Sequence, residues 1–249
     1  MSTTHPTMLL RHVRKLATLA VDVSDRDLLQ RFAASRDEAA FAELVRRHGA
    51  MAYRTAERIL HNAHDAEDVF QATFLTLSRK AGALAWRESI GPWLYEVANR
   101  LALEAKTAAA RRRQCEGRAA ARTAADPLTD ITLREAQSIF DAELLRLDEH
   151  LRAPVILCHL EGATQDEAAR QLGLSLGTFR RRLEQGRELL RKRLTRRGLA
   201  LSAVLLASVL VPASGTAAIP AGLAQATVRT AVLVAVGGNA AGSVSDPVL

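Results

Sequence analysis

One stretch of the chain, residues 151–194, restricts the possible folds more than any other, because it has the pattern of two short helices joined by a tight turn. Thr164 can cap the first helix, and Glu167, three residues later, completes a capping box. Gly173 stands where the end of a helix favours a left-handed residue, and Ser175 can cap the helix that follows. A helix, a four-residue turn containing glycine and a second helix together predict a helix-turn-helix motif.

The second helix of this motif has two distinct faces when its residues are placed at about 100° per residue. The apolar side, expected to face the core, holds Phe179, Leu183, Gly186, Leu190 and Leu194. The exposed side holds Thr178, Arg181 and Gln185, flanked by Arg180, Arg182 and Arg187. A helix that reads DNA needs base-contacting side chains at the centre of its exposed face and phosphate-binding cations beside them, and arginine suits both tasks. The predicted DNA contacts are Thr178, Arg180, Arg181, Arg182 and Gln185. The alternative is a solvated basic helix in an ordinary bundle.

Charge and composition agree with a nucleic-acid partner. The chain of 249 residues carries a net charge of +7, and its sequence pI is about 10.2. Such a chain is expected to bind a polyanion, with nucleic acid first and an anionic membrane second. Only 4% of the residues are aromatic, and alanine, leucine and arginine dominate, which favours helices over sheets.

The cysteines argue against a disulfide-rich or zinc-binding protein, and the N-terminus argues against a secreted one. Cys115 and Cys158 lie far apart without CxxC or cysteine–histidine ligand spacing, so we expect neither a disulfide framework nor a zinc site. The basic residues near the N-terminus are followed by no continuous apolar run, so a signal peptide is not supported. We expect a cytoplasmic protein without a metal site.

Helical periodicity continues through most of the chain. The expected helices cover residues 25–34, 38–60, 64–81, 93–113 and 131–147, with a loop at residues 82–92. Between the last two helices the pattern dissolves into alanine and arginine, which is typical of a flexible linker. We predict an all-α fold of two small helical domains with an apolar tail. Its boundaries are a lead-in at 1–24, domains at 25–113 and 131–197, a linker at 114–130 and the tail at 198–249.

The helix expected at residues 64–81 has an acidic first turn. Its apolar stripe comprises Ala66, Val69, Phe70, Thr73, Phe74 and Leu77. Asp65, Glu67 and Asp68 at its start can complement the helix dipole by a few tenths of a kcal/mol each. Alternatively, Asp65, Asp68 and Gln71 form a polar docking face for a partner. The residues alone leave both interpretations open.

The next segment suits single-stranded DNA. Trp86 lies in the loop ahead of a helix that carries Asn99, Arg100 and Lys106. Cations can hold a nucleic-acid backbone while aromatic or apolar walls accept unstacked bases. Trp86 is the better candidate for exposure, whereas Trp93 is expected in the core.

Taken in order, these segments resemble the bacterial sigma factors of the extracytoplasmic-function (ECF) group over residues 25–194. The family helix that docks on the clamp coiled coil of RNA polymerase β′ is similar to DAEDVFQATFLTL. The segment that melts and reads the minus-ten promoter element is similar to GPWLYEVANRLALEAKTAAARRR. The domain that reads the minus-thirty-five element is similar to EGATQDEAARQLGLSLGTFRRRLEQGRELLRKRL. Two such blocks, joined by a linker of this length, are far more specific than a lone helix-turn-helix motif.

The resemblance implies site residues and partners. The implied polymerase-facing residues are Asp65, Glu67, Asp68, Gln71 and Phe74. The minus-ten candidates are Asn99, Arg100 and Lys106, to which the loop argument adds Trp86. Core RNA polymerase and promoter DNA are the implied partners, and an anti-sigma factor is a further partner that the resemblance allows. Because the polymerase supplies the chemistry, the resemblance implies no catalytic residues and no cofactor in this chain. Phe179 stands where the family usually has valine, and Gln185-Gly186 replaces Arg-Ala or Arg-Gly, departures that can alter promoter preference.

The tail lies outside this resemblance. From residue 199 to residue 249 only Arg229 and Asp246 are charged. The apolar run at 199–211 falls short of the ~20 residues that a membrane-spanning helix needs, and the run at 231–236 is shorter still. Three interpretations stay open: weak membrane association through residues 199–236, an apolar helix that folds back on the protein or a partner, and disorder.

Two other functions compete with a sigma factor. A transcription regulator could use the helix-turn-helix motif alone and bind an operator without polymerase. A membrane-associated scaffold could bind lipid headgroups through its arginine-rich helices. The capping box and the glycine turn argue against the scaffold, because lipid binding requires neither.

Overall fold

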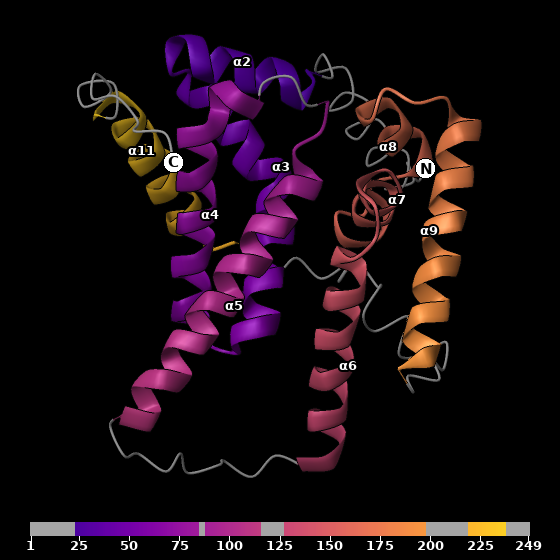
Figure 1. Ribbon diagram of the computed structural model, residues 1–249. Helices are drawn as coiled ribbons and strands as arrows, with labels where there is room; N and C mark the ends of the chain where they lie inside the picture. The colour runs from indigo at the N-terminus through magenta and orange to yellow at the C-terminus, as the bar shows by residue number, and fades with distance from the viewer. Residues whose placement is uncertain (1–22, 85–87, 116–126, 198–218, 238–249) are drawn as a thin grey trace, which may run out of the picture.

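A computed structural model describes residues 23–84, 88–115, 127–197 and 219–237 (Figure 1). These residues form an all-α structure of two helical domains, which confirms the predicted fold class. The linker residues 116–126, Trp86 and the apolar run at 199–211 lie outside the described residues.

In the part of the N-terminal domain that the structure describes, four helices form a bundle. They are α2 (Asp25–Ser35), α3 (Glu38–Leu60), α4 (Ala63–Leu84) and α5 (Gly91–Cys115). Ser24 caps α2 by accepting a hydrogen bond from the Asp27 amide at 3.1 Å, and Asp37 caps α3 by accepting one from the Ala40 amide at 3.0 Å. Both cap side chains satisfy backbone donors that the first turn of a helix leaves unpaired.

Aromatic side chains fill the centre of this bundle. The rings of Phe32 and Phe41 lie 4.5 Å apart between centroids, and those of Phe70 and Phe74 lie 4.9 Å apart. All four side chains are fully buried. Edge-on and tilted packing of this kind stabilises the core beyond the area that it buries.

The C-terminal domain contains the helix-turn-helix motif. Its helices are α6 (Pro127–Leu145), α7 (Glu149–Val155), the π-helical turn η1 (Ile156–Leu160), α8 (Gln165–Gln171) and α9 (Leu176–Arg196). Thr164 and Glu167 form the predicted capping box, and Gly173 has the expected positive φ of 62°. Ser175 caps α9 by accepting a hydrogen bond from the Thr178 amide. The motif is therefore formed as its sequence predicts.

The π-helical turn was not expected from the sequence. Pro154 lies inside α7, where a proline lacks the backbone donor and crowds the carbonyl four residues earlier. Directly after Pro154 the helix changes from the α to the wider π pattern. The Glu161 amide donates to the Ile156 carbonyl, five residues earlier, at 3.1 Å. The wide turn delivers Glu161 to the side of the domain that meets the N-terminal bundle.

Only the helix at residues 38–60 has the predicted bounds, and the ends of α2, α4, α5 and α6 differ from the prediction by one to four residues. Helix α5 begins at Gly91 rather than at residue 93, and α6 begins at Pro127 rather than at residue 131. Proline is favoured in the first turn of a helix, because its missing amide would have no partner there. The segment between the two helices is thus shorter than the predicted linker.

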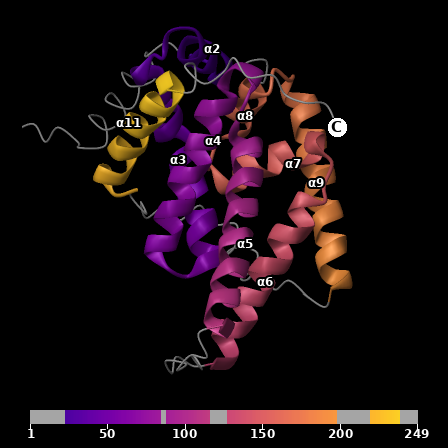
Figure 2. The ribbon, with the colours of Figure 1, turned by 60° about the vertical axis from the view of Figure 1, so that its left-hand side comes forward.

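Part of the tail folds back on the protein. Helix α11 (Ala221–Gly237) packs against α3 and α4, on the side of the bundle away from α9 (Figures 1 and 2). Its buried residues are Leu223, Thr227, Val228, Ala231 and Ala235. Of the three interpretations of the tail, the structure places residues 221–237 in the second. Among the described helices, none combines the length and the apolar character that crossing a membrane would require.

Candidate nucleic-acid and protein interfaces

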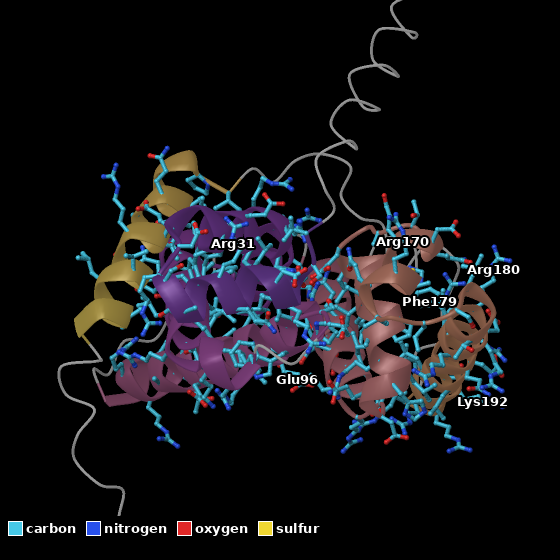
Figure 3. All side chains as sticks on the ribbon, turned by 90° about the horizontal axis from the view of Figure 1, so that it is seen from above. Arg31, Glu96, Arg170, Phe179, Arg180 and Lys192 are labelled. Atoms are coloured by element: carbon cyan, nitrogen blue, oxygen red, sulfur yellow. The ribbon has the colours of Figure 1, made fainter. Side chains whose placement is uncertain are left out.

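Helix α9 presents the two faces that its sequence predicts. Its buried residues are Phe179, Leu183, Gly186, Leu190 and Leu194. On the other side, Arg180, Arg181 and Gln185 are exposed, and Thr178 and Arg182 are half-buried. Figure 3 shows Phe179 inside the C-terminal domain and Arg180 at its outer edge. All five predicted DNA contacts thus lie on one helix outside its buried stripe, three of them exposed and two partly exposed.

Polar contacts hold this helix against its neighbours. Arg180 donates from Nε to Oε1 of Gln165 on α8 at 3.1 Å. Arg187 donates from Nε to Nε2 of His159 on η1 at 3.0 Å. Burial, together with the Arg187 charge, lowers the pKa of His159 to about 4, so its ring is neutral and can accept this bond near pH 7. The basic face is therefore positioned by side chains outside the helix.

The later half of α9 is charge-paired. Glu188 accepts from Arg191 at 2.9 Å and lies 3.4 Å from the Lys192 ammonium. Arg181 lies two turns earlier, on the exposed part of the helix that follows the glycine turn. A recognition helix uses its N-terminal part to reach base edges in the major groove, so the chemistry of this part suits guanine or phosphate contacts.

Helix α5 carries the described minus-ten candidates, and one of them needs correction. Arg100 is exposed and lies 3.8 Å from Glu104 across one turn, and Lys106 is exposed as well. Asn99 is only 2% exposed, because it lies on the side of α5 that faces the C-terminal domain. It lines a groove of about 540 Å³ between α5 and Leu145. In this arrangement Asn99 is not available to DNA.

Helix α4 carries the predicted polymerase-facing residues, and one of these predictions is also wrong. Asp68 is exposed, and Asp65, Glu67 and Gln71 are half-buried. Phe74 is fully buried between Phe41 and Phe70, so it belongs to the core and not to a docking surface. The helical periodicity of the sequence already placed Phe74 in the apolar stripe, and that signal was the better guide.

Three polar residues at the domain boundary were missed by the sequence analysis. His48 and Asp141 are buried, Glu161 is partly buried, and all three are partnered across the two domains. Each stands alone in the sequence, and His48 and Glu161 are 113 positions apart, so no local pattern marks them. Within the described ranges, no cluster of three or more histidine, cysteine, aspartate or glutamate side chains could hold a metal ion.

Comparison with known proteins finds a family model that matches each of the two domains. The Sigma-70 region 2 family model matches residues 44–112, and the Sigma-70, region 4 model matches residues 137–190. The ECF RNA polymerase sigma factor SigE of Mycolicibacterium smegmatis is 35% identical over 167 residues, which cover 64% of this chain and 65% of that protein. The chain thus spans just under two thirds of SigE.

A second relative is matched over more of its length. The RNA polymerase sigma factor CarQ of Myxococcus xanthus is 31% identical over 159 residues, which cover 61% of this chain and 88% of that protein. A solved structure of CnrH in complex with the cytosolic domain of CnrY is 24% identical, with a TM-score of 0.34 and coverage of 69% of this chain and 97% of that one. On its two matched regions and its similarity to SigE and CarQ, the chain belongs to the ECF group of RNA polymerase sigma factors.

Proposed function

We infer that this chain is a non-enzymatic initiation factor that binds core RNA polymerase and directs it to promoter DNA. The observation that carries this function is the presence, in one chain and in family order, of region 2 and of a region 4 with an exposed basic recognition helix. The polymerase supplies the chemistry. The chain acts in the cytoplasm, where polymerase and chromosome meet.

Recognition of the minus-thirty-five element is assigned to α9. We propose that Arg181 and Gln185 read base edges, while Arg180 and Arg182 bind phosphates on either side. Exposure of Arg180 and Arg181 and the cap at Ser175 support this assignment. Phosphate contacts dominate the affinity of such a surface, so binding to bare DNA should be weak and should fall steeply with salt.

The minus-ten element and the polymerase are assigned to the N-terminal domain. We propose that Arg100 and Lys106 on α5 hold the backbone of the opened strand, with Trp86 as a stacking residue. For the clamp coiled coil of β′, the proposed contacts are Asp65, Glu67, Asp68 and Gln71. The exposure of Asp68 and the partial exposure of the other three side chains support this assignment.

Charge reversal on α9 separates promoter reading from polymerase binding. Arg181→Glu should lower run-off transcription from the cognate promoter roughly five- to 150-fold, because a bidentate base contact provides about 1–3 kcal/mol of discrimination. Its affinity for core polymerase, measured by fluorescence anisotropy, should not change. Lys192→Glu, at the far end of the same helix, is the matched control and should transcribe normally. Equal transcription by both variants would remove Arg181 from the proposed site.

The alternative is a helix-turn-helix regulator that works without polymerase. The region 2 match does not favour it, because such a regulator needs only the C-terminal domain. Co-purification with core polymerase discriminates the two functions. Tight operator binding combined with no polymerase binding would support the alternative and end the sigma-factor assignment for this chain.

An anti-sigma factor and membrane association stay predictions. Helix α11 uses its apolar side against α3 and α4, which leaves that side unavailable to lipid. The remaining argument for a membrane rests on the apolar run at 199–211. Fractionation of cells without detergent tests it, and recovery of the protein wholly in the soluble fraction would contradict it.

A further inference from the structure

Buried polar side chains join the two domains. His48 on α3 is 2% exposed and has a carboxylate on each ring nitrogen. Its Nδ1 lies 2.7 Å from Oε1 of Glu161, which follows η1 in the C-terminal domain. Its Nε2 lies 2.8 Å from Oδ2 of Asp25 at the start of α2. One imidazole ring therefore connects elements of both domains.

The same cluster is tied to the start of α5. Oδ2 of Asp25 also accepts from the Ile90 amide at 3.1 Å, and Arg47 lies 3.4 Å from the other carboxylate oxygen. The Glu161 carboxylate lies over Gly91, so closely that a Cβ there would stand 2.4 Å from Oε1. A carboxylate at the N-terminus of a helix is favoured by the helix dipole. Gly91 is thus the residue that lets Glu161 reach His48.

His48 is charged in this position. Burial alone would lower the pKa of His48, but the charges and hydrogen bonds of Asp25 and Glu161 raise it well above its ordinary value. Burial would raise the pKa of Asp25, yet His48, the Ile90 amide and Arg47 lower it to about 2. A protonated ring donates from both nitrogens, and it has two carboxylates to receive those protons.

Two further bridges cross the same boundary. Arg58 on α3 donates to both carboxylate oxygens of Asp141 on α6, at 3.1 and 2.7 Å, and the Tyr95 hydroxyl on α5 donates to Asp141 at 2.7 Å. Arg152 on α7 pairs with Glu96 on α5. Figure 3 shows Glu96 where the two domains meet. The bridges thus tie α3 and α5 to α6, α7 and η1.

This closed arrangement cannot grip a promoter at two places. The minus-ten and minus-thirty-five elements are about 25 base pairs apart, or roughly 85 Å at ~3.4 Å per base pair. Here α5 and the C-terminal domain are in hydrogen-bonding contact, and Asn99 faces that domain. The two domains must part before both elements can be bound.

We propose that Asp25–His48–Glu161 and Arg58–Asp141–Tyr95 form a latch that holds the free protein closed, and that binding to polymerase and promoter requires it to open. This proposal rests on the proposed function, because that function sets the distance between the domains. Buried charge pairs roughly break even against their hydrated states, whereas a buried charge that loses its partner is costly. A latch of this kind is therefore specific in geometry yet reversible, and a partner that binds only the open form can release it.

Single-molecule energy transfer in the full-length chain tests the latch. Dyes are placed at Lys80→Cys on α4 and Lys192→Cys on α9, both exposed, after Cys115 and Cys158 are replaced by serine. The parent should show one dominant high-transfer population. Asp141→Asn combined with Glu161→Gln should increase the low-transfer population at least fivefold, because Arg58 and His48 lose their charged partners in the closed form.

Gly91→Ala provides an independent variant that keeps every charge. Its methyl group displaces the Glu161 carboxylate from His48, and alanine is well tolerated in a helix. Gly82→Ala on α4 is the matched control, since a Cβ there meets nothing within 4 Å. Circular dichroism confirms that each variant is folded. Identical transfer histograms for the parent, Gly91→Ala and the double variant would overturn the latch.

Measuring the affinity of each variant for core polymerase distinguishes a failure of the latch from a failure of the proposed function. If the closed form cannot bind, the apparent Kd for core polymerase should fall in proportion to the gain in open population, about fivefold in the double variant for a chain that starts mostly closed. A shift in the histograms without polymerase binding by any variant would support the latch and refute the proposed function. Normal polymerase binding with unmoved histograms would refute the latch alone.

Discussion

At the scale of single residues, Gly186 lets α7 and α9 approach closely. A Cβ at this position would stand 2.8 Å from the Leu151 carbonyl, a backbone atom that cannot turn away. We expect Gly186→Ala to destabilise the protein by about 1–3 kcal/mol, as overpacking does in a close-packed core. Gly177→Ala in the same helix meets nothing within 4 Å and should stabilise by up to about 0.5 kcal/mol. Thermal unfolding followed by circular dichroism measures both, and equal midpoints would contradict the packing argument.

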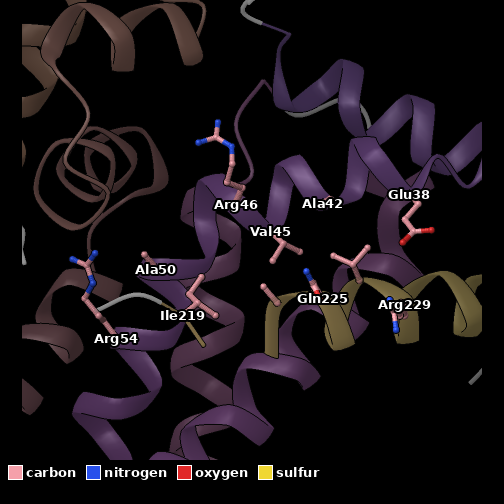
Figure 4. A pocket seen from close by; sticks show the side chains of 11 residues that line it. Glu38, Ala42, Val45, Arg46, Ala50, Arg54, Ile219, Gln225 and Arg229 are labelled. Atoms are coloured by element: carbon pink, nitrogen blue, oxygen red, sulfur yellow. The ribbon is translucent and has the colours of Figure 1, made fainter. Parts of the chain in front are cut away.

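At the scale of elements, α11 depends on a glycine of α3. A pocket of about 600 Å³ lies between these helices, with Ile219 at one end (Figure 4). A Cβ at Gly49 would stand 2.5 Å from Cδ1 of Ile219 and 3.3 Å from the Phe70 ring. Gly49→Ala should therefore loosen the tail without unfolding α3, because alanine is the better helix former.

Hydrogen exchange measures this loosening. Amides of α11 should exchange at least tenfold faster in Gly49→Ala, while those of α4 stay protected. Gly82→Ala is again the control, and exchange in α11 should match the parent. Unchanged protection of α11 in Gly49→Ala would show that the contact with Ile219 contributes nothing to docking of the tail.

At the scale of the whole molecule, closure should depend on pH. Glu161 contacts His48 only in the closed form, so the pKa of His48 is higher when the domains are closed than when they are open. The closed form then binds protons more tightly, and its advantage is lost as the pH rises through the closed-state pKa of His48, above the ordinary value of about 6.5. Asp141, whose pKa is raised by burial, acts in the same sense, while Tyr95 stays neutral because its pKa lies well above 10.0.

Energy transfer measured from about pH 6 to about pH 9 checks whether the closed form is lost as the pH rises. This range covers the pH values at which a histidine with a raised pKa loses its charge. The low-transfer population of the parent should grow on the alkaline side. Glu161→Gln should flatten the response, because its His48 loses the carboxylate that distinguishes the closed state. Growth of the open population toward acid instead would contradict the assigned role of His48.

The sequence by itself determined the main helices of both domains, the caps at Thr164 and Ser175, the glycine turn and the inward stripe of α9. These features depend on neighbours within one or two turns, so periodicity and capping chemistry are enough to predict them. The tertiary structure alone decided that Asn99 is buried, that α11 covers α3 and α4, and that His48 lies between Asp25 and Glu161. Such contacts join residues far apart in the sequence, 113 positions in the case of His48 and Glu161 and more where α11 meets α3. Which helices become neighbours depends on the packing of the whole chain rather than on any local pattern.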